Sequence, residues 1–179
     1  MQMIKESDLK VLFDKNQIQT AIEELGKKIN QVYSDEEVYL ICVLKGSVMF
    51  MTDLSKHLKM PVRMEFIRLS SYGSGFTSSG RVSAVDISLP DLNDKNVLII
   101  EDIIDTGHTA KFLVEFIKHN FKPKTLNFCS LLDKKCKREV EIDADYYCFE
   151  VDDKFLVGYG LDYNGYYRNL SYIGYVEVD

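Results

Sequence analysis

A run of acidic and small polar residues near the middle of the chain has the types and spacing needed to hold a phosphorylated sugar. In the stretch VLIIEDIIDTGHT, residues 97–109, Glu101 and Asp102 follow four apolar residues, and the loop Asp105-Thr106-Gly107-His108-Thr109 leads into an apolar run at helical spacing. The first turn of a helix offers unpaired backbone N–H groups and a partial positive charge, so this loop is a natural phosphate site. A carboxylate pair beside it can hold sugar hydroxyls or a Mg²⁺ ion.

The same residues also have a structural explanation. Glu101 and Asp102 could end a strand, and Thr106 or Thr109 could cap a helix. The complete string is harder to explain this way, because few structural roles need two acids, two apolar residues and then Asp-Thr-Gly-X-Thr. The chain has neither a GxGxxG sequence after a strand nor a GxxxxGK[ST] sequence, so the usual nucleotide-binding loops do not compete.

The elements that must position this loop alternate between helices and strands. Helical spacing begins after Asp14, after Ser47 and after Thr109. Strands are expected at 38–44, 62–72, 81–89, 96–100, 125–132 and 146–151, with a glycine-serine loop at 73–80. The aromatic, glycine-rich tail from Phe155 to Leu170 predicts a cap of loops and short strands.

This alternation predicts an α/β fold, a doubly wound and mainly parallel sheet flanked by helices, because several of the strands read as near-continuous apolar runs. In such sheets, ligands bind beyond the carboxyl ends of the strands. Glu101, Asp102 and Asp105 are expected at one of these ends, where a site belongs.

The composition indicates a single domain spanning residues 1–179, without a linker or a repeat. The net charge of −6 argues against nucleic-acid binding as the main activity. No apolar run is long enough to cross a membrane, and no targeting segment is evident, so we expect a cytoplasmic protein. The four cysteines lack metal-binding spacing, and three lie in or beside apolar runs, as expected of buried thiols in a reducing compartment.

Five motifs carry a resemblance to a known family. VLIIEDIIDTGHT resembles the phosphoribosyl diphosphate (PRPP) motif of the type I phosphoribosyltransferases. LKGS at 44–47, SSYGSG at 70–75, SLLDK at 130–134 and DKFLVGYGLDYNGYYRNL at 153–170 narrow the match to the hypoxanthine-guanine phosphoribosyltransferases, of the bacterial hypoxanthine type. The resemblance runs from about residue 38 to about residue 175. It implies a hood formed by the N-terminal segment and about 150–179, and a mobile loop.

The resemblance implies roles for the central stretch. Asp105, Thr106, Gly107, His108 and Thr109 would wrap the 5′-phosphate of PRPP. Glu101 and Asp102 would face the ribose hydroxyls and a Mg²⁺ ion, the expected cofactor. Asp105 would also be the catalytic residue, exchanging a proton with the imidazole nitrogen of the purine.

For the purine, the resemblance implies four residues. Lys134 would donate to the exocyclic oxygen, although it could instead belong to a solvated turn in the basic run KKCKR. Phe155 would stack on the base, with simple core packing as the alternative, and the backbone of Leu156 would read the base edge. Asp162 would bind a second Mg²⁺ through the pyrophosphate, or be only a turn residue in LDYNG.

For the pyrophosphate, the resemblance implies Lys45, Gly46 and Arg168, with Ser71 and Tyr72 at the start of the mobile loop. A lysine directly after a buried strand is costly unless it meets an anion, which favours a site at Lys45. In the family the peptide between Leu44 and Lys45 can be cis. Arg168 could instead be an ordinary surface arginine.

Two residues depart from the pattern of the family. His108 stands where some relatives have lysine, so one cation near the phosphate becomes pH-dependent or is lost. Leu156 stands where valine is common, which leaves the base preference open.

The expected reaction transfers the 5-phosphoribosyl group from PRPP to hypoxanthine or guanine, giving IMP or GMP and pyrophosphate in purine salvage. A preference for xanthine or a tolerance of adenine is a rival within the same class, although a donor at Lys134 argues against adenine. A PRPP-sensing regulator that binds RNA or DNA is a rival from another class. The intact set of Asp105, Lys134 and Asp162 favours the enzyme. The partners are then PRPP and a 6-oxopurine, without nucleic acid or membrane, in a homodimer or homotetramer.

Overall fold

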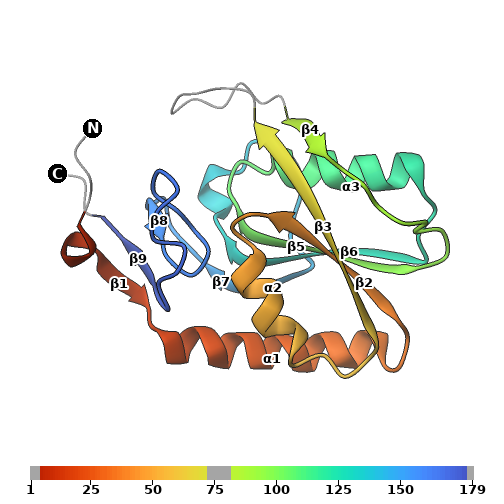
Figure 1. Cartoon of the computed structure of the whole chain (residues 1–179), viewed down its shortest axis with the longest axis horizontal. Coiled ribbons are helices and arrows are strands. Elements are labelled where there is room, and N and C mark those ends of the chain that lie inside the picture. Colours follow the sequence, from red (N-terminus) through yellow and green to blue (C-terminus); the bar gives the residue numbers. More distant parts are fainter. Residues whose placement is uncertain (1–4, 72–81, 177–179) are drawn as a thin grey trace.

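A twisted six-stranded sheet forms the body of the protein in the computed structural model, which describes residues 5–71 and 82–176 (Figure 1). Its order is β4-β3-β2-β5-β6-β7. Neighbouring strands from β3 to β7 are parallel, and only β4 runs antiparallel to its neighbour. The strands are β2 (Val38–Leu44), β3 (Val62–Ser71), β4 (Val82–Asp86), β5 (Asn96–Ile104), β6 (Thr125–Asp133) and β7 (Tyr146–Glu150). The expected mainly parallel sheet is therefore confirmed.

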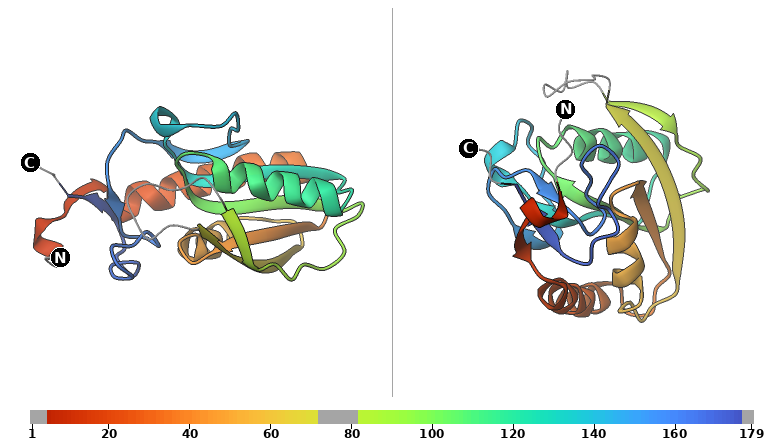
Figure 2. Two further views of the ribbon diagram at one scale, coloured as in Figure 1. Left: turned by 90° about the horizontal axis from the view of Figure 1, so that it is seen from above. Right: turned by 60° about the vertical axis from the view of Figure 1, so that its left-hand side comes forward.

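Helices cover both faces of this sheet (Figures 1 and 2). Helices α1 (Lys15–Tyr33) and α2 (Val48–Ser55) pack in one apolar cluster, and α3 (His108–Asn120) packs in a second cluster on the opposite face. The side chain of Asp14 caps α1 as the sequence predicts, because its Oδ1 accepts from the Gln17 N–H at 2.9 Å. Burial on two faces explains why β2 and β5 read as continuous apolar runs.

The N-terminal segment and the tail meet in a second, smaller sheet at one end of the molecule. It contains β1 (Lys10–Phe13), β9 (Ile173–Tyr175) and β8 (Leu156–Val157), in that order and antiparallel. The rings of Phe13 and Phe149 stack 4.0 Å apart and join this sheet to β7. We call these three strands the hood sheet. Two short 3₁₀ turns complete the fold, η1 (Glu6–Asp8) and η2 (Lys135–Lys137).

The largest difference from the sequence-based prediction concerns β5, which continues to Ile104 instead of ending at residue 100. Glu101 and Asp102 therefore lie inside the strand and not just after it. Pairing with β6 continues through Glu101 and Ser130 to Ile104 and Asp133, which keeps the backbone extended. On the other side, pairing with β2 stops at Ile100, and the turn after β2 approaches Asp102 instead.

Other expectations have mixed outcomes. Strand β1 lies in a segment for which no strand was predicted. Ser71 ends β3, whereas Tyr72 and the glycine-serine loop at 73–80 lie outside the described residues, as does the expected mobile loop. Within the described part of the chain, no helix has the length and apolar character to span a membrane.

Candidate active site

The loop between β5 and α3 forms one wall of a small hollow at the carboxyl end of the sheet. We call residues 105–109 the phosphate loop. Gly107 is the N-cap of α3 and has a φ of 89°, in the left-handed region that favours glycine. The hollow is lined by Glu101, Ile103, Ile104, Asp105, Thr106, Gly107, Thr109 and Ala110. The structure thus brings five of the predicted phosphate and ribose residues to one place, at the start of a helix.

A second segment, residues 134–142, supports the phosphate loop from behind; we call it the backing segment. It donates to three consecutive carbonyls: the Lys134 N–H to Ile104 O at 2.9 Å, the Arg138 Nη1 to Asp105 O at 3.1 Å, and the Glu139 N–H to Thr106 O at 2.9 Å. Backbone carbonyls on this side are therefore satisfied by protein groups.

His108 begins α3 and is paired with the same segment. Its Nε2 lies 2.8 Å from Oε2 of Glu139, and the Glu139 side chain is more than half exposed. The imidazole at this position therefore already has an acidic neighbour.

Glu101 and Asp102 are adjacent carboxylates inside a buried strand. Burial, followed by the nearby Asp102 carboxylate, raises the pKa of Glu101 well above its usual value. Burial also raises the pKa of Asp102, although the N–H of Ile103, 2.8 Å from its Oδ1, and the charge of Arg168 act in the opposite direction. Among the described residues, Oε2 of Glu101 is buried and has no hydrogen-bond partner. This free oxygen could accept a hydrogen bond from a hydroxyl group or bind a cation.

The Lys45-Gly46 turn lies directly against Asp102. A Cβ on Gly46 would lie 1.5 Å from Oδ2 of Asp102, so only glycine fits. The Leu44–Lys45 peptide is cis, as the family resemblance implied. The side chain of Lys45 is exposed, so burial alone does not require an anion beside it, and its role toward pyrophosphate stays a prediction. The turn leaves β2 and puts Lys45 at the surface.

The tail of the chain also reaches this turn. A Cβ on Gly160 would lie 1.9 Å from the Gly46 carbonyl oxygen, and Gly160 has a φ of 102°. Arg168 donates from Nη1 to Gly160 O at 2.6 Å and pairs through Nη2 with Oδ1 of Asp162 at 2.6 Å. Arg168 is therefore partly buried and joins two parts of the tail, so it is not an ordinary surface arginine.

Asp162 forms a turn with its other carboxylate oxygen. Its Oδ2 accepts from the Gly165 N–H at 2.7 Å, which is the turn role considered for this residue. In the described part of the chain, no three acidic, histidine or cysteine side chains are arranged to hold a metal ion by themselves. The structure does not unite Asp162 with Glu101 and Asp102 in one metal site.

The Glu101–Asp102 pair nevertheless fits a hydrated Mg²⁺. This ion keeps several waters and usually binds through one or two carboxylates together with substrate oxygens. Two neighbouring carboxyl groups, one with an oxygen that has no hydrogen-bond partner among the described residues, match that requirement. The pair would hold Mg²⁺ only when a ligand supplies the remaining oxygens.

Lys134 connects the phosphate loop with the tail. Its side chain is only 9% exposed, its Nζ donates to Lys154 O at 3.0 Å, and Nζ lies 3.7 Å from Oδ2 of Asp105 and 4.0 Å from Asp153. The alternative of a solvated turn is therefore wrong for Lys134. It holds for Lys135 and Lys137, which are exposed and pair with Glu150 and Asp153.

Phe155 and Leu156 have opposite exposures. Phe155 is 46% exposed, which excludes the core-packing alternative, and its ring meets Tyr163 edge-on with centroids 5.8 Å apart. Leu156 is buried in β8, where its backbone pairs with Tyr175. An accessible aromatic ring beside a fixed strand is suited to stacking on a flat ligand.

Sequence reasoning missed several residues that hold these parts together. Arg138 and Asp133 form a buried ion pair at the end of β6. The hydroxyl of Tyr159 donates to Oδ2 of Asp53 at 2.5 Å and ties the tail to α2. Nothing in the sequence marks them, because Arg138 is one of five residues in KKCKR and Asp53 lies in an ordinary helical pattern.

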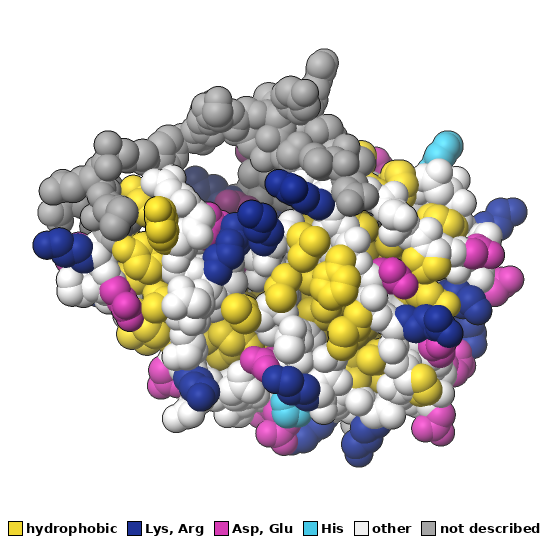
Figure 3. All heavy atoms as spheres, in the orientation of Figure 1, with side chains coloured by type: hydrophobic (Ala, Val, Ile, Leu, Met, Phe, Trp, Pro, Cys, Tyr) yellow, Lys and Arg dark blue, Asp and Glu magenta, His cyan; other side chains and the backbone are white. Residues whose placement is uncertain are grey.

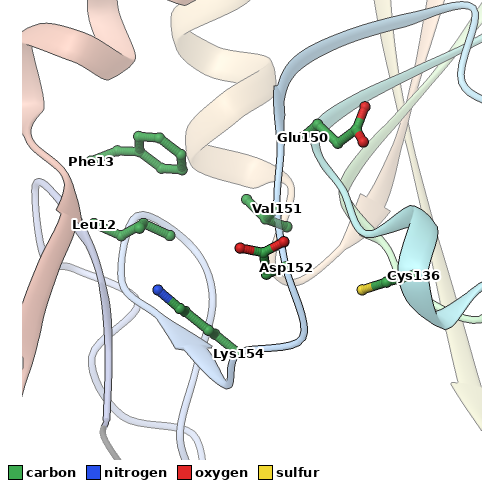
Figure 4. Close-up of a pocket in the computed structure, with 7 residues that line it drawn as sticks. All are labelled: Leu12, Phe13, Cys136, Glu150, Val151, Asp152 and Lys154. Carbon is green, nitrogen blue, oxygen red and sulfur yellow. The ribbon is translucent and has the colours of Figure 1, made fainter.

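Two wider surface features surround the site. Basic side chains gather on one face between the hood sheet and the main sheet (Figure 3). A separate hollow lies between β1 and the end of β7, lined by Leu12, Phe13, Cys136, Glu150, Val151, Asp152 and Lys154 (Figure 4). None of the predicted site residues lines that second hollow.

Comparison with known proteins decides which family this site belongs to. The family model of the phosphoribosyl transferase domain matches residues 9–164. The chain belongs to the phosphoribosyltransferase family. It is 40% identical over 177 residues to the hypoxanthine-guanine phosphoribosyltransferase of Streptococcus thermophilus, covering 99% of this chain and 98% of the relative. It is 43% identical to the Bacillus subtilis enzyme of the same name over 175 residues, covering 98% and 97%.

The fold of this phosphoribosyltransferase agrees with a solved relative. The crystal structure of a hypoxanthine phosphoribosyltransferase from Staphylococcus aureus matches with a TM-score of 0.91 and 38% identity, covering 99% of this chain and 96% of that one. The expected type I phosphoribosyltransferase fold and the expected enzyme class are confirmed.

Proposed function

We propose that this phosphoribosyltransferase acts in purine salvage and transfers the 5-phosphoribosyl group from PRPP to hypoxanthine or guanine, releasing pyrophosphate. The observation that carries the proposal is the 3.7 Å distance between Lys134 Nζ and Asp105 Oδ2. Asp105 opens the phosphate loop and Lys134 reaches the tail, so one charged pair joins the phosphate end to the expected purine end. The named relatives support the same reaction.

In this proposal Asp105 manages the proton of the purine. As the ribosyl carbon bonds to a ring nitrogen and its bond to pyrophosphate breaks, the imidazole N–H of the base loses its proton to the Asp105 carboxylate. The side chain is about half exposed, so it can reach a ligand in the hollow. Thr106, Gly107, His108 and Thr109 hold the 5′-phosphate with the N–H groups at the start of α3.

The purine is selected by the groups that face the tail. Lys134 donates to the exocyclic oxygen of a 6-oxopurine, while adenine would present an amino group, itself a donor, to the ammonium. Phe155 stacks on the ring, and the backbone of Leu156 reads its edge. The buried position of Lys134 supports this role, because a desolvated ammonium gains most from an added acceptor.

We assign the pyrophosphate to residues from three segments of the chain. Lys45 and Gly46 come from the turn after β2, Arg168 comes from the tail, and Ser71 and Tyr72 begin the segment expected to close over the reactants. Gly46 contacts both Asp102 and Gly160, which supports a shared subsite for the leaving group. Cations here neutralise charge that develops as pyrophosphate departs.

We propose Mg²⁺ as the cofactor, with one ion held by Glu101 and Asp102 together with substrate oxygens and a second ion bound by Asp162 through pyrophosphate. When bound, these ions neutralise the pyrophosphate oxygens. Activity is expected to vanish in excess chelator and to return when Mg²⁺ is restored, measured as pyrophosphate release. Undiminished turnover in chelator would contradict the metal role.

The reaction itself is tested by mixing the protein with PRPP, Mg²⁺ and one base at a time. Hypoxanthine and guanine are expected to give a nucleoside monophosphate and equimolar pyrophosphate, xanthine less, and adenine none above a control without base. Pyrophosphate release with adenine but not with hypoxanthine would contradict the proposal.

We also propose a homodimer or homotetramer. On β3, the side chains of Met64 and Phe66 share a face and are 42% and 47% exposed, and an apolar patch is visible over this strand (Figure 3). Exposed apolar patches often mark contact surfaces. Light scattering after size exclusion measures the mass directly, and a monomer at micromolar concentration would contradict the proposal.

We propose that the enzyme is cytoplasmic. All four cysteines are free, and Cys42 and Cys129 are buried, which suits a reducing compartment. Cell fractionation with an antibody against this chain tests the location, and recovery outside the cytoplasmic fraction would contradict it.

A further inference from the structure

The backing segment donates hydrogen bonds to three consecutive carbonyls, that of Ile104 at the end of β5 and those of the first two residues of the phosphate loop, and it uses two kinds of donor. The carbonyls of Ile104 and Thr106 accept from backbone N–H groups, of Lys134 and Glu139. The carbonyl between them, on Asp105, accepts from the side chain of Arg138 at 3.1 Å. Of the three donors, only the Arg138 guanidinium is a side chain. A substitution at Arg138 can therefore remove this hydrogen bond and keep the two backbone hydrogen bonds.

The direction of these carbonyls matters for an anion. In a tight loop, the N–H of one residue and the C=O of the residue before it belong to one planar peptide and point in opposite directions. When the Asp105 carbonyl is drawn toward Arg138, the N–H of Thr106 points to the opposite side. Fixed N–H groups on one side of a turn are what binds phosphate in a loop of this kind.

The guanidinium of Arg138 is itself held in place. Its Nη2 pairs with Oδ1 of Asp133, a residue without exposed surface at the end of β6, and the Arg138 side chain is only 13% exposed. Its stem lies against the loop, since a Cβ on Gly107 would lie 3.0 Å from Cδ of Arg138. A planar guanidinium can bridge two acceptors at fixed positions, which a lysine ammonium cannot do as well.

We propose that Arg138 is a positioning residue for PRPP: anchored by Asp133, it holds the Asp105 carbonyl so that the phosphate loop presents its N–H groups to the 5′-phosphate. Arg138 does not touch the substrate in this arrangement. The inference rests on the proposed function, because it assumes that PRPP is the ligand of the loop.

The expected effect is selective for one substrate. Two hydrogen bonds hold Lys134 in place: its backbone N–H donates to Ile104 O, and its Nζ donates to Lys154 O. Neither hydrogen bond involves Arg138. Loss of the Arg138 contact should therefore weaken PRPP and leave the purine almost unaffected. Small displacements of binding groups can cost up to about a hundredfold in rate or affinity.

The primary variant is Arg138→Lys, which keeps the cation for Asp133 and loses the bridge to the Asp105 carbonyl. Because a single-charge deletion would leave Asp133 buried without a partner, the second variant is the pair Arg138→Met with Asp133→Asn, which removes both charges. Lys135→Met is the matched control, since it removes a neighbouring exposed cation that pairs with Glu150. Thermal unfolding verifies that each variant is folded.

The test measures PRPP binding by calorimetric titration in the presence of Mg²⁺. Steady-state kinetics on the same preparations give the KM for PRPP and for hypoxanthine. Both Arg138 variants are expected to raise the PRPP dissociation constant and KM by about tenfold or more, with the hypoxanthine KM within about twofold, whereas Lys135→Met changes neither. PRPP affinity within twofold of wild type in both variants, or equal weakening of PRPP and hypoxanthine, would overturn the inference. Wild-type protein that fails to bind PRPP would overturn the proposed function and the inference with it; wild-type activity with unaffected variants overturns the inference alone.

Discussion

The phosphate loop and the tail that carries the hood sheet are built in opposite ways. The loop is five consecutive residues, three between β5 and α3 and two at the start of α3, and its supports come from one segment about thirty residues later. The tail has β8 and β9, joined by turns with left-handed residues at Tyr159, Asn164 and Tyr167, and its sheet is completed by β1 from the other end of the chain.

The loop and the tail therefore contribute to the proposed site in different ways. The residues that the loop contributes to the site are contiguous in sequence, at the point where β5 ends and α3 begins, although the backing segment holds their carbonyls. The tail contributes Phe155, Leu156, Asp162 and Arg168, whose positions depend on contacts between distant segments such as Gly160 with Gly46. The proposed phosphate subsite is therefore local, and the proposed purine and pyrophosphate subsites are not.

The sharpest test of the loop separates chemistry from binding. Asp105→Asn keeps the shape and the backbone of the loop but removes the basic oxygen. Turnover is expected to fall by about two to four orders of magnitude, the usual contribution of a general base, while PRPP affinity changes little. Steady-state kinetics and PRPP titration on one preparation measure both. A normal rate, or equal loss of rate and PRPP binding, would mean that Asp105 only shapes the loop.

The largest effect in the tail should be on folding stability. Gly160→Ala puts a methyl group 1.9 Å from the Gly46 carbonyl at a φ of 102°, so unfolding free energy is expected to fall by about 3 kcal/mol. Gly165→Ala is the matched control, because its φ of 85° is also left-handed but no atom lies within 4 Å of the added Cβ. It should cost only about 1 kcal/mol. Equal losses in urea unfolding would show that the contact with Gly46 is unimportant.

Lys134 tests the junction between the two regions. Lys134→Ala removes a charged donor, which typically contributes about 1.5–3 kcal/mol, so the hypoxanthine KM should rise by one to two orders of magnitude. The PRPP KM should change far less. An unchanged KM for hypoxanthine would assign Lys134 to the structure of the backing segment alone.

Burial of the Glu101 carboxylate beside the phosphate loop should lower the stability of the folded protein. Because the pKa of Glu101 is raised in the folded protein, its charged form destabilises the fold above that raised pKa, and the penalty disappears as the pH falls below the ordinary value of about 4.3. Glu101→Gln is therefore expected to stabilise the protein by about 1 kcal/mol at pH 8. The gain should shrink as the pH falls, and activity should drop. Urea unfolding at several pH values checks this, and a gain independent of pH would contradict it.

The smallest effect is expected at His108. Its ion pair with Glu139 is partly exposed, and such pairs contribute little. His108→Ala should change the PRPP dissociation constant by less than about threefold, because the backbone N–H groups remain. A loss of tenfold or more in titration would show that the imidazole itself carries phosphate binding.

How much the sequence could predict follows the same division between local and distant structure. The alternating sheet, the Asp14 cap and the acidic stretch at the end of β5 were predictable, because each depends on neighbouring residues. The last four residues of β5 were not, since continued pairing with β6, and not local propensity, keeps Glu101 and Asp102 extended. Strand β1 has only four residues and needs β9 as a partner, which no local pattern reveals.

The candidate site shows the same limit at the level of single residues. Asp105, Lys134 and Arg168 could be assigned from motifs, but the exposure of Lys45 and the burial of Arg138 could not. In KKCKR, Lys135 and Lys137 face solvent while Lys134 and Arg138 turn inward. All are cations in one short run, and only the path of the backbone over the phosphate loop distinguishes them.

The pairing of β1 with β9 has a consequence for the biosynthesis of this protein. Phe13 is opposite Ile173, so a strand made near the start of translation waits for a partner made near its end. The main sheet, from β2 to β7, can assemble earlier from segments that are already available. A nascent chain stalled before residue 173 would therefore contain a formed phosphate loop beside an unfinished hood sheet, and the backbone edge of β1 that pairs with β9 would be open to chaperones.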